Sequence, residues 1–187
     1  MSAASKGRAE CAKVLISNGA KVNTKDDEGD TALIIAVGKD YADFAKVLLA
    51  NGADVNVKDG NGWPALFEPA RLGYTDCVKL LLANGANVNA RDTQNGGTAL
   101  FPAASKGQGG CVRLLLDSGV NVNARATDGI TALMSATIYG HADIVRVLIS
   151  HGATVNAKTT DGYTALKMAA EKGHDKVVRV LKAAGAK

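Results

Sequence analysis

Aromatic residues are scarce in this chain of 187 residues, and long apolar runs are absent. Phe, Trp and Tyr together make up 4% of the sequence, so the core must be built from Leu, Val, Ile and Ala. No apolar run approaches the roughly 18 residues that a membrane-spanning helix needs. The first ten residues, MSAASKGRAE, lack the apolar stretch of a signal peptide. We therefore expect a cytoplasmic protein that makes no contact with a membrane.

Negative charge is scarce in the second half of the chain. The formal net charge is +4, but residues 1–93 hold 11 basic and 12 acidic residues, whereas residues 94–187 hold 11 and 6. A positive C-terminal half could attract nucleic acid or an acidic partner. Aromatic side chains that could stack on bases are too few beside these charges, so nucleic-acid binding is the less favoured interpretation.

Glycine, in contrast, is abundant and periodic. Six glycines follow each other at intervals of 33, 33, 34, 33 and 33 residues, and several other positions recur in phase. These glycines are Gly19, Gly52, Gly85, Gly119, Gly152 and Gly185. A repeat of this length is typical of solenoids built from identical supersecondary units.

One unit can be interpreted physically from residues 162–186. Thr164 is a good N-cap for a short first helix over residues 165–172, which Gly173 ends. Asp175 begins a second helix and favours its dipole. The apolar face of that helix has helical spacing and consists of Val177, Val178, Val180 and Leu181. Each helix is too short to be stable alone, so we expect the units to stack and share one apolar layer.

The recurring residues D-G-x-T-A-L, A-A, G-H, V-V-x-x-L-L and G-A resemble the ankyrin repeat over essentially the whole chain. The resemblance implies an all-α solenoid of about five and a half repeats, in which β-turn fingers precede stacked helix-turn-helix pairs. We expect this solenoid to form a single domain over residues 1–187. We expect a partial repeat at 1–25 and full repeats at about 26–58, 59–91, 92–125, 126–158 and 159–187.

This sequence departs from the family pattern in two places. The histidine that usually follows T-P-L is replaced in all five copies, so its usual hydrogen bond is not expected. The replacements are Ile34, Phe67, Phe101, Met134 and Lys167. The first copy also begins in the middle of a repeat, so a complete N-terminal cap is missing. We expect either a fragment of a larger protein or a natural protein that has been trimmed.

The second and third copies have features that should weaken them. Pro64 replaces the N-cap threonine and is tolerated at a helix start, but Pro69 and Pro102 fall inside the first helices and should bend or shorten them. The third copy also has an extra residue within 91–97. Gly109 and Gly110 stand at the start of its second helix, where other copies place an acidic residue.

Cysteine and histidine favour structural roles over chemical ones. Cys11, Cys77 and Cys111 occupy one repeat position and are expected to be buried free thiols, since neighbouring helices lie too far apart for a disulfide. His141 and His174 are equivalent, and no histidine pair has metal-ligand spacing. We find no catalytic motif and expect no metal, cofactor or enzymatic activity.

Two sets of polar residues recur along the fingers and helices. One cation per finger base, and another on the outer face of each second helix, are expected to form solvated surfaces. The finger-base cations are Lys25, Lys58, Arg91, Arg125 and Lys158, and the outer-face cations are Lys13, Lys46, Lys79, Arg113, Arg146 and Arg179. Asn23, Asn56, Asn89, Asn123 and Asn156 are expected to tie successive fingers together through their amides.

The most variable position comes just after each finger glycine and is the best candidate for recognition. It holds Asp30, Trp63, Gly97, Ile130 and Tyr163. In the ankyrin architecture this position and the end of the first helix face the concave groove. Packing against the neighbouring finger is the alternative role. The predicted partner-binding residues are Trp63, Arg71, Leu72, Ile130, Ile138, Tyr139 and Tyr163.

We therefore expect a non-enzymatic monomer that binds an unidentified protein partner through its concave face. A regulatory or targeting segment of a larger protein, and an engineered or consensus-like scaffold, are the alternatives.

Overall fold

The computed structural model describes residues 1–187 and contains eleven α-helices and one short 3₁₀ helix, Ala4–Lys6. The first helices of the pairs are α2 (Ala32–Gly38), α4 (Phe67–Leu72), α6 (Leu100–Ser105), α8 (Ala132–Ile138) and α10 (Ala165–Glu171). The second helices are α1 (Ala9–Ser17), α3 (Ala42–Ala50), α5 (Thr75–Ala83), α7 (Gly109–Asp117), α9 (Ala142–Ser150) and α11 (Asp175–Ala183). None of them has the length and apolar character to cross a membrane.

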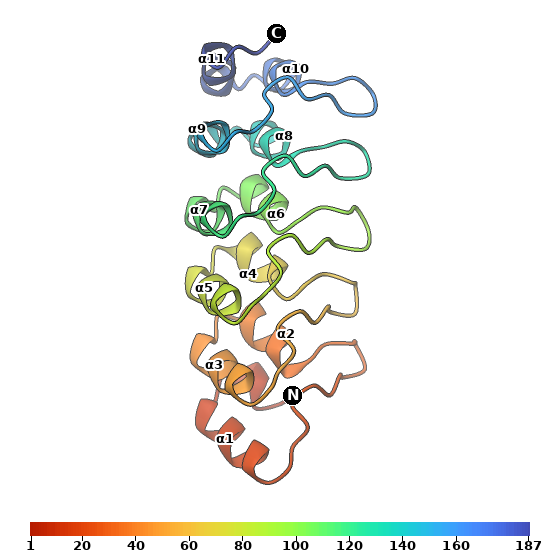
Figure 1. Cartoon of the computed structure of the whole chain (residues 1–187), viewed down its shortest axis with the longest axis vertical. Helices are drawn as coiled ribbons and strands as arrows, with labels where there is room; N and C mark the ends of the chain where they lie inside the picture. The colour runs from red at the N-terminus through yellow and green to blue at the C-terminus, as the bar shows by residue number, and fades with distance from the viewer.

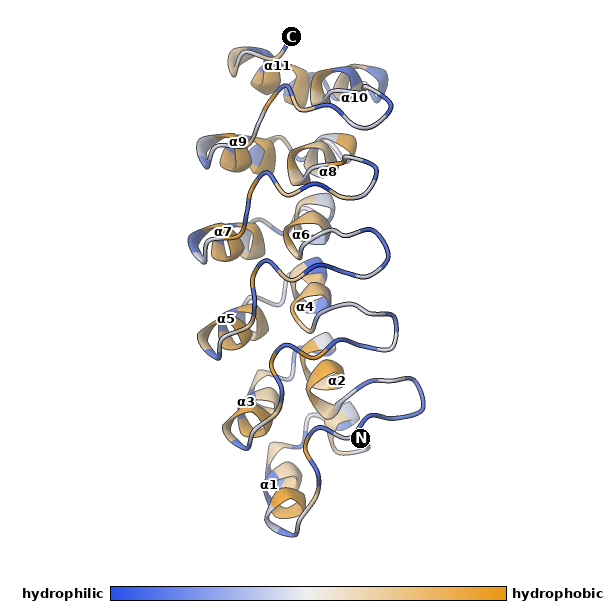
Figure 2. Cartoon of the chain, turned by 45° about the vertical axis from the view of Figure 1, so that its right-hand side comes forward, coloured by the Kyte–Doolittle hydropathy of each residue, from blue (hydrophilic) through white to orange (hydrophobic).

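The two sets of helices form two parallel columns, and a finger projects beside every first helix (Figure 1). The fingers are mostly hydrophilic, whereas the helices of both columns contain many hydrophobic residues (Figure 2). Each helix therefore contributes to one shared layer, and the predicted stack of fingers and helix pairs is confirmed.

Threonine caps the first helix in three copies. The Oγ1 atoms of Thr31, Thr131 and Thr164 accept hydrogen bonds from the amides three residues later, at 3.3–3.4 Å. The sequence prediction for Thr164 is thus confirmed. Gly173, two residues after α10, has φ +71° and takes the left-handed conformation that ends the helix.

Proline shortens α4 and α6, as the sequence predicts. Each has six residues, whereas α2, α8 and α10 have seven. Pro69 and Pro102 have no amide to donate to the preceding turn, so the regular helix begins later. In the third copy the Phe101 amide donates to the Thr98 carbonyl, and the Thr98 hydroxyl is buried without a partner.

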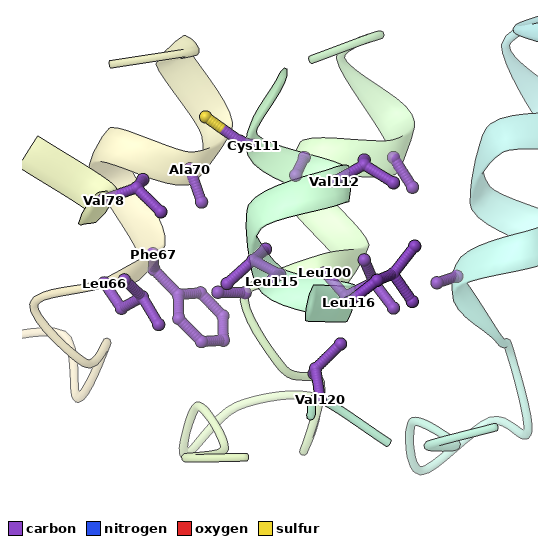
Figure 3. Close-up of a cluster of buried hydrophobic side chains, with 14 of the residues drawn as sticks. Leu66, Phe67, Ala70, Val78, Leu100, Cys111, Val112, Leu115, Leu116 and Val120 are labelled. Atoms are coloured by element: carbon purple, nitrogen blue, oxygen red, sulfur yellow. The ribbon is translucent and has the colours of Figure 1, made fainter. Parts of the chain in front are cut away.

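The core is a continuous layer with the same residue type at the same place in each copy. One leucine of each second helix from α3 to α11 is at most 3% exposed; these are Leu48, Leu81, Leu115, Leu148 and Leu181. Figure 3 shows Phe67 of α4, Leu100 of α6 and Leu115 of α7 within one cluster of buried apolar side chains. The layer is therefore built from contacts between copies as well as within them.

The layer ends at α1, where one sequence prediction is wrong. Cys77 and Cys111 are 0% exposed, but the equivalent Cys11 is exposed. Leu15, which is equivalent to the buried core leucines, is 52% exposed, and Val14 is 61% exposed. The equivalent Val177 and Leu181 of α11, the last helix of the stack, are 0% exposed, so a copy on both sides is not required. What α1 lacks is a preceding copy and a full first helix, since only the 3₁₀ helix Ala4–Lys6 comes before it.

The asparagines join successive copies, although not from finger to finger as expected. Asn23 Nδ2 donates to the Gly52 carbonyl at 2.9 Å, and its Oδ1 accepts from the Asp54 amide at 2.8 Å. Both partners lie in the turn after α3. The same pair of bonds recurs at Asn56, Asn89, Asn123 and Asn156. Each asparagine thus connects the turn after one second helix to the turn after the next.

The finger-base cations are largely exposed, as predicted for a solvated face, and they also join successive fingers. Lys25 Nζ donates to the Lys58 carbonyl at 3.1 Å, and Lys58 Nζ donates to the Arg91 carbonyl at 2.9 Å. Arg91 and Arg125 continue the series to the carbonyls of Arg125 and Lys158, at 2.8 and 2.6 Å. The outer-face cations behave as predicted: Lys13 and Lys79 form exposed ion pairs within their own helices.

Imidazole and amide side chains bond to the preceding copy, whereas the finger-base cations bond to the following one. Nε2 of His141 lies 3.0 Å from the Ser105 carbonyl, and Nε2 of His174 lies 2.9 Å from the Ile138 carbonyl. Gln108 makes the equivalent bond to Arg71 at 3.3 Å. The structural role predicted for His141 and His174 is therefore confirmed.

The third finger, which is one residue longer, folds around a buried carboxylate. Asp92 is 8% exposed and accepts hydrogen bonds from the amides of Gln94, Asn95 and Gly97, at 2.8, 2.6 and 2.9 Å. The other four fingers instead close with an isolated β-bridge between the finger-base cation and Thr31, Pro64, Thr131 or Thr164. The Asp92 bonds satisfy the amides of the extra turn, so the insertion does not displace the stack.

Gly109 offers a test of how weak the third copy is. It begins α7 and has ordinary helical space around it, since a methyl group there would meet Arg113 only at 3.8 Å. Gly109→Ala should raise the free energy of unfolding by about 0.5–1 kcal/mol, because alanine loses less backbone entropy.

The matched control is Gly107→Ala, which should lower the free energy of unfolding. Urea denaturation measures both variants. Gly107 has φ +77°, and a methyl group there would lie 2.9 Å from the His141 ring. Equal effects of the two substitutions would contradict this account.

Candidate functional site

The groove between the fingers and the first helices contains a pocket of about 360 Å³. Its apolar walls come from three successive copies: Trp63 and Phe67, then Phe101 and Pro102, then Ile130. Polar groups at its edge are Glu68, Arg71, Asp92, Asn95 and Asp128. We refer to this space as the Trp63 pocket. Its volume lies near the lower end of the roughly 300–1,000 Å³ typical of ligand pockets.

Hydrogen bonds within the fingers fix the backbone at the two ends of the pocket. The Trp63 amide donates to Asp59 Oδ1 at 2.7 Å, and the Asp59 amide donates to the Trp63 carbonyl at 2.9 Å. Ile130 is held in the same way by Asp128 Oδ1 at 2.9 Å and by the Ala126 amide at 2.9 Å. Trp63 and Ile130 are half-buried and pack partly against the core. The pocket is thus preorganised by its own fingers.

Arg71 lies at the edge of the pocket in a two-point ion pair with Glu68. Its Nε donates to Glu68 Oε2 at 2.7 Å, and its Nη2 donates to Glu68 Oε1 at 2.5 Å. The Glu68 carboxylate raises the pKa of Arg71 above its ordinary value. Both side chains are half-buried, so the pair forms a fixed polar rim beside the apolar walls.

An acidic groove of about 610 Å³ adjoins the pocket on its N-terminal side. The two spaces share Trp63, Glu68 and Arg71. The acidic groove is also lined by four carboxylates from the first two fingers, which are Asp26, Glu28, Asp30 and Asp59, and by Lys39. Acidic side chains therefore dominate one end of the inner surface.

Asp30 is the most perturbed carboxylate of this groove. Partial burial is the main reason that its pKa is raised, and the neighbouring charges of Asp59, Asp26 and Glu28 raise it further. The Gly60 amide, which donates to Asp30 Oδ1 at 3.3 Å, opposes the shift. Asp30 thus lies in a partly buried and locally negative environment.

The structure brings only part of the predicted recognition set together. Trp63, Arg71 and Ile130 line the Trp63 pocket, but Leu72, Ile138, Tyr139 and Tyr163 do not. These four residues occur at the ends of α4 and α8 and in the last finger.

Each aromatic residue outside the pocket has its own neighbour. Tyr139 is 59% exposed and stacks on His141, with ring centroids 6.5 Å apart. The Lys167 ammonium lies 4.1 Å from the centre of the Tyr163 ring, within range of a cation–π interaction. Tyr163 is half-buried, and Leu72 and Ile138 are half-buried as well.

Phe67 and Phe101 are pocket residues that the sequence analysis did not identify as binding residues. They occupy the position where the ankyrin pattern usually has histidine, and this replacement by a large apolar residue in consecutive copies was the available signal. Glu68 and Asp128 were also missed, because a single carboxylate in each copy gives no indication of a pocket.

The outer surface has an open groove of about 1080 Å³ between α9 and α11. Arg146, Lys176 and Arg179 line it, and Arg146 pairs with Asp143 of its own helix. It is larger than the Trp63 pocket, and a greater share of its lining is polar. The structure contains no group of three or more His, Cys, Asp or Glu side chains that could hold a metal ion.

Comparison with known proteins agrees with the architecture. The family model for ankyrin repeats (3 copies) matches residues 1–59, 56–126 and 100–187. A crystal structure of an ankyrin repeat domain (ABAYE2397) from Acinetobacter baumannii AYE superposes with a TM-score of 0.91 at 34% identity, covering 99% of this chain and 96% of that one. The ankyrin repeat protein EF0377 has a TM-score of 0.89 at 30% identity, covering 97% of this chain and 94% of that one. No curated protein sequence matches. Its repeats, its helix pairs and these similarities show that the chain belongs to the ankyrin repeat family.

Proposed function

We propose that this protein is a non-enzymatic recognition module that binds a partner protein in the groove between its fingers and first helices. Ankyrin repeats form a general protein–protein interaction fold, but the fold alone does not identify the surface that is used. The observation that carries the proposal is the Trp63 pocket, in which three copies converge on one apolar space with a fixed polar rim.

The composition of the pocket supports this role. Trp and Arg are enriched among the residues that dominate binding energy, and such residues act best in a preformed, water-excluding site. Trp63 supplies a large apolar surface, and Arg71 is immobilised by Glu68. Because the finger backbone is already fixed by hydrogen bonds, a partner would lose little free energy in ordering the site.

Four further residues belong to the proposed surface as secondary contacts. Ile138, Tyr139 and Tyr163 would extend the contact toward the C-terminal end of the groove, and Leu72 would flank Arg71. The exposed ring of Tyr139 is available to a partner, and Lys167 orients the ring of Tyr163.

Trp63→Ala should weaken partner binding by more than about 1 kcal/mol, because it removes the largest apolar wall of the pocket. The partner is obtained by capture on the unmodified protein, and the dissociation constant is then measured by calorimetry with each variant. Circular dichroism should be unchanged, since Trp63 is only half-buried.

The matched control is Arg179→Ala, which alters the outer groove and should leave the dissociation constant unchanged. If Trp63→Ala binds at full strength while Arg179→Ala binds weakly, the outer groove is the interaction surface and the proposal is wrong.

A further inference from the structure

We propose that the partner segment that fills the Trp63 pocket carries a lysine or arginine beside its apolar side chain, and that this cation lies in the acidic groove next to Asp30. The inference rests on the proposed function and specifies the chemistry of the partner. It follows from the shared walls of two adjoining spaces and from the charges that line one of them.

The two spaces form one continuous surface. The Trp63 pocket accepts an apolar group, and the acidic groove begins at the same Trp63 and at the Glu68–Arg71 pair. An extended segment that places one side chain in the pocket can continue in two directions. It either crosses the Glu68–Arg71 pair into the acidic groove or runs the opposite way, toward the C-terminal copies. If it runs toward the N-terminal end of the stack, its next side chains meet the first two fingers.

The charges of the acidic groove are not balanced. Its lining contains five carboxylates, including Glu68, and two cations, Lys39 and Arg71. Arg71 is already engaged in the two-point pair with Glu68. Lys39 is the one remaining cation in the lining. Asp26 and Asp59 already accept hydrogen bonds from the backbone amides of their own fingers, so Glu28 and Asp30 are the carboxylates that a partner cation would meet. A partner that removes water from these carboxylates without supplying positive charge would leave them poorly compensated.

Asp30 is the point where a cation is most favourable. Burial and three neighbouring carboxylates already raise its pKa, so its charged form is destabilised in the free protein. An ammonium or guanidinium group of the partner would stabilise that charge and complement the field of Asp26, Glu28 and Asp59. An acidic partner would be repelled by the same four groups, which makes the groove selective.

The fingers also determine on which side of the pocket the cation lies. An acidic residue follows the finger-base cation in the first three fingers, whereas the fourth and fifth fingers have Ala126 and Thr159 there. The surface on the C-terminal side of Ile130 consequently lacks this carboxylate. The basic residue of the partner is thus expected toward the first finger and not toward the last.

A random peptide library displayed on phage provides the probe. Panning on the unmodified protein should enrich peptides that combine one large apolar residue with Lys or Arg at a fixed spacing. The test variant is the double substitution Glu28→Gln and Asp30→Asn, which keeps an acceptor for the Gly60 amide. The control is Asp43→Asn with Asp117→Asn, which changes the net charge equally at exposed positions away from the groove.

The selected peptide should bind the test variant at least about 10-fold more weakly at low salt, and the difference should shrink as salt screens the charges. The control should bind within about 2-fold of the unmodified protein, as expected for exposed charges far from the site. Panning on the test variant should keep the apolar preference and lose the basic one.

The outcomes separate the two proposals. Peptides that depend on Trp63 but show no basic preference, or that bind the test variant at full strength, overturn the cation inference and leave the proposed function intact. Peptides that bind Trp63→Ala at full strength, or a library with no enriched motif, overturn both.

Discussion

Leu81→Ala is expected to lower the free energy of unfolding by about 2–5 kcal/mol, the usual cost of removing a fully buried leucine side chain. Leu15→Ala, at the equivalent position of α1, should cost less than about 1 kcal/mol. The two substitutions delete the same atoms from the same position of the repeat. Leu81 is 0% exposed between neighbouring copies, whereas Leu15 is 52% exposed.

The comparison isolates the contribution of the surrounding helices, because the same side chain is removed at both positions and α1 lacks a preceding copy and a full first helix. Urea denaturation followed by far-ultraviolet circular dichroism and by Trp63 fluorescence measures both variants, and coincident transitions justify a single free energy. Losses of similar size at Leu15 and Leu81 would show that burial between copies does not determine stability here.

A second large effect is expected in thiol chemistry. Burial raises the pKa of Cys77 from 9.0 to about 12, with a smaller contribution from the Asp40 carboxylate, and burial raises the pKa of Cys111 to about 11. A raised thiol pKa lowers the thiolate fraction at pH 8, by roughly 1,000-fold for Cys77 and 100-fold for Cys111. Cys11 is exposed. One thiol per chain should therefore react rapidly with a disulfide reagent at pH 8, and two should react slowly.

Mass spectrometry of the labelled protein identifies the reactive residue. Cys11→Ser should remove the rapid phase completely, and unfolding in guanidinium should expose the remaining thiols. Both buried thiols stay mostly protonated up to about pH 9, so raising the pH from 7 to 9 should not bring their rates close to that of Cys11. Rapid labelling of Cys77 or Cys111 in the native protein would contradict their position in the core.

The sequence was sufficient to predict the helix pairs because each one depends on local signals. Thr164 caps a helix, Gly173 ends it, and Asp175 begins the next, within twelve residues. Pro69 and Pro102 act on their own helices as well, and the predicted shortening is found. These effects are short-range, so one repeat contains all the information that is needed to predict them.

Properties that depend on a neighbouring copy were harder to predict. Cys11 occupies the same repeat position as Cys77, yet it is exposed because α1 has no copy before it and no full first helix. Lys25 and Arg125 look like surface cations until the next finger supplies a carbonyl about 33 residues away. Asp92 is recognisable as the centre of the longer finger only when its amide partners are known.

The candidate site shows the same division. The repeat register placed Trp63 and Ile130 at one position of the finger, and both line the Trp63 pocket. The register does not specify the side-chain conformation, which decides whether a residue reaches the neighbouring copy. For that reason it could not indicate that Phe67 and Phe101 join the pocket or that Tyr139 stacks on His141 instead.

The bonds from Lys25, Lys58, Arg91 and Arg125 all run from one finger to the next in the same direction along the stack. A unit duplicated between residues 125 and 158 would therefore enter with an acceptor for the cation before it and a donor for the carbonyl after it. Whole units could be gained or removed without creating an unmatched partner at either junction. A partial unit would break the series at once. We therefore expect the array to change length in whole units of about 33 residues, both when it is engineered and when it evolves by tandem duplication.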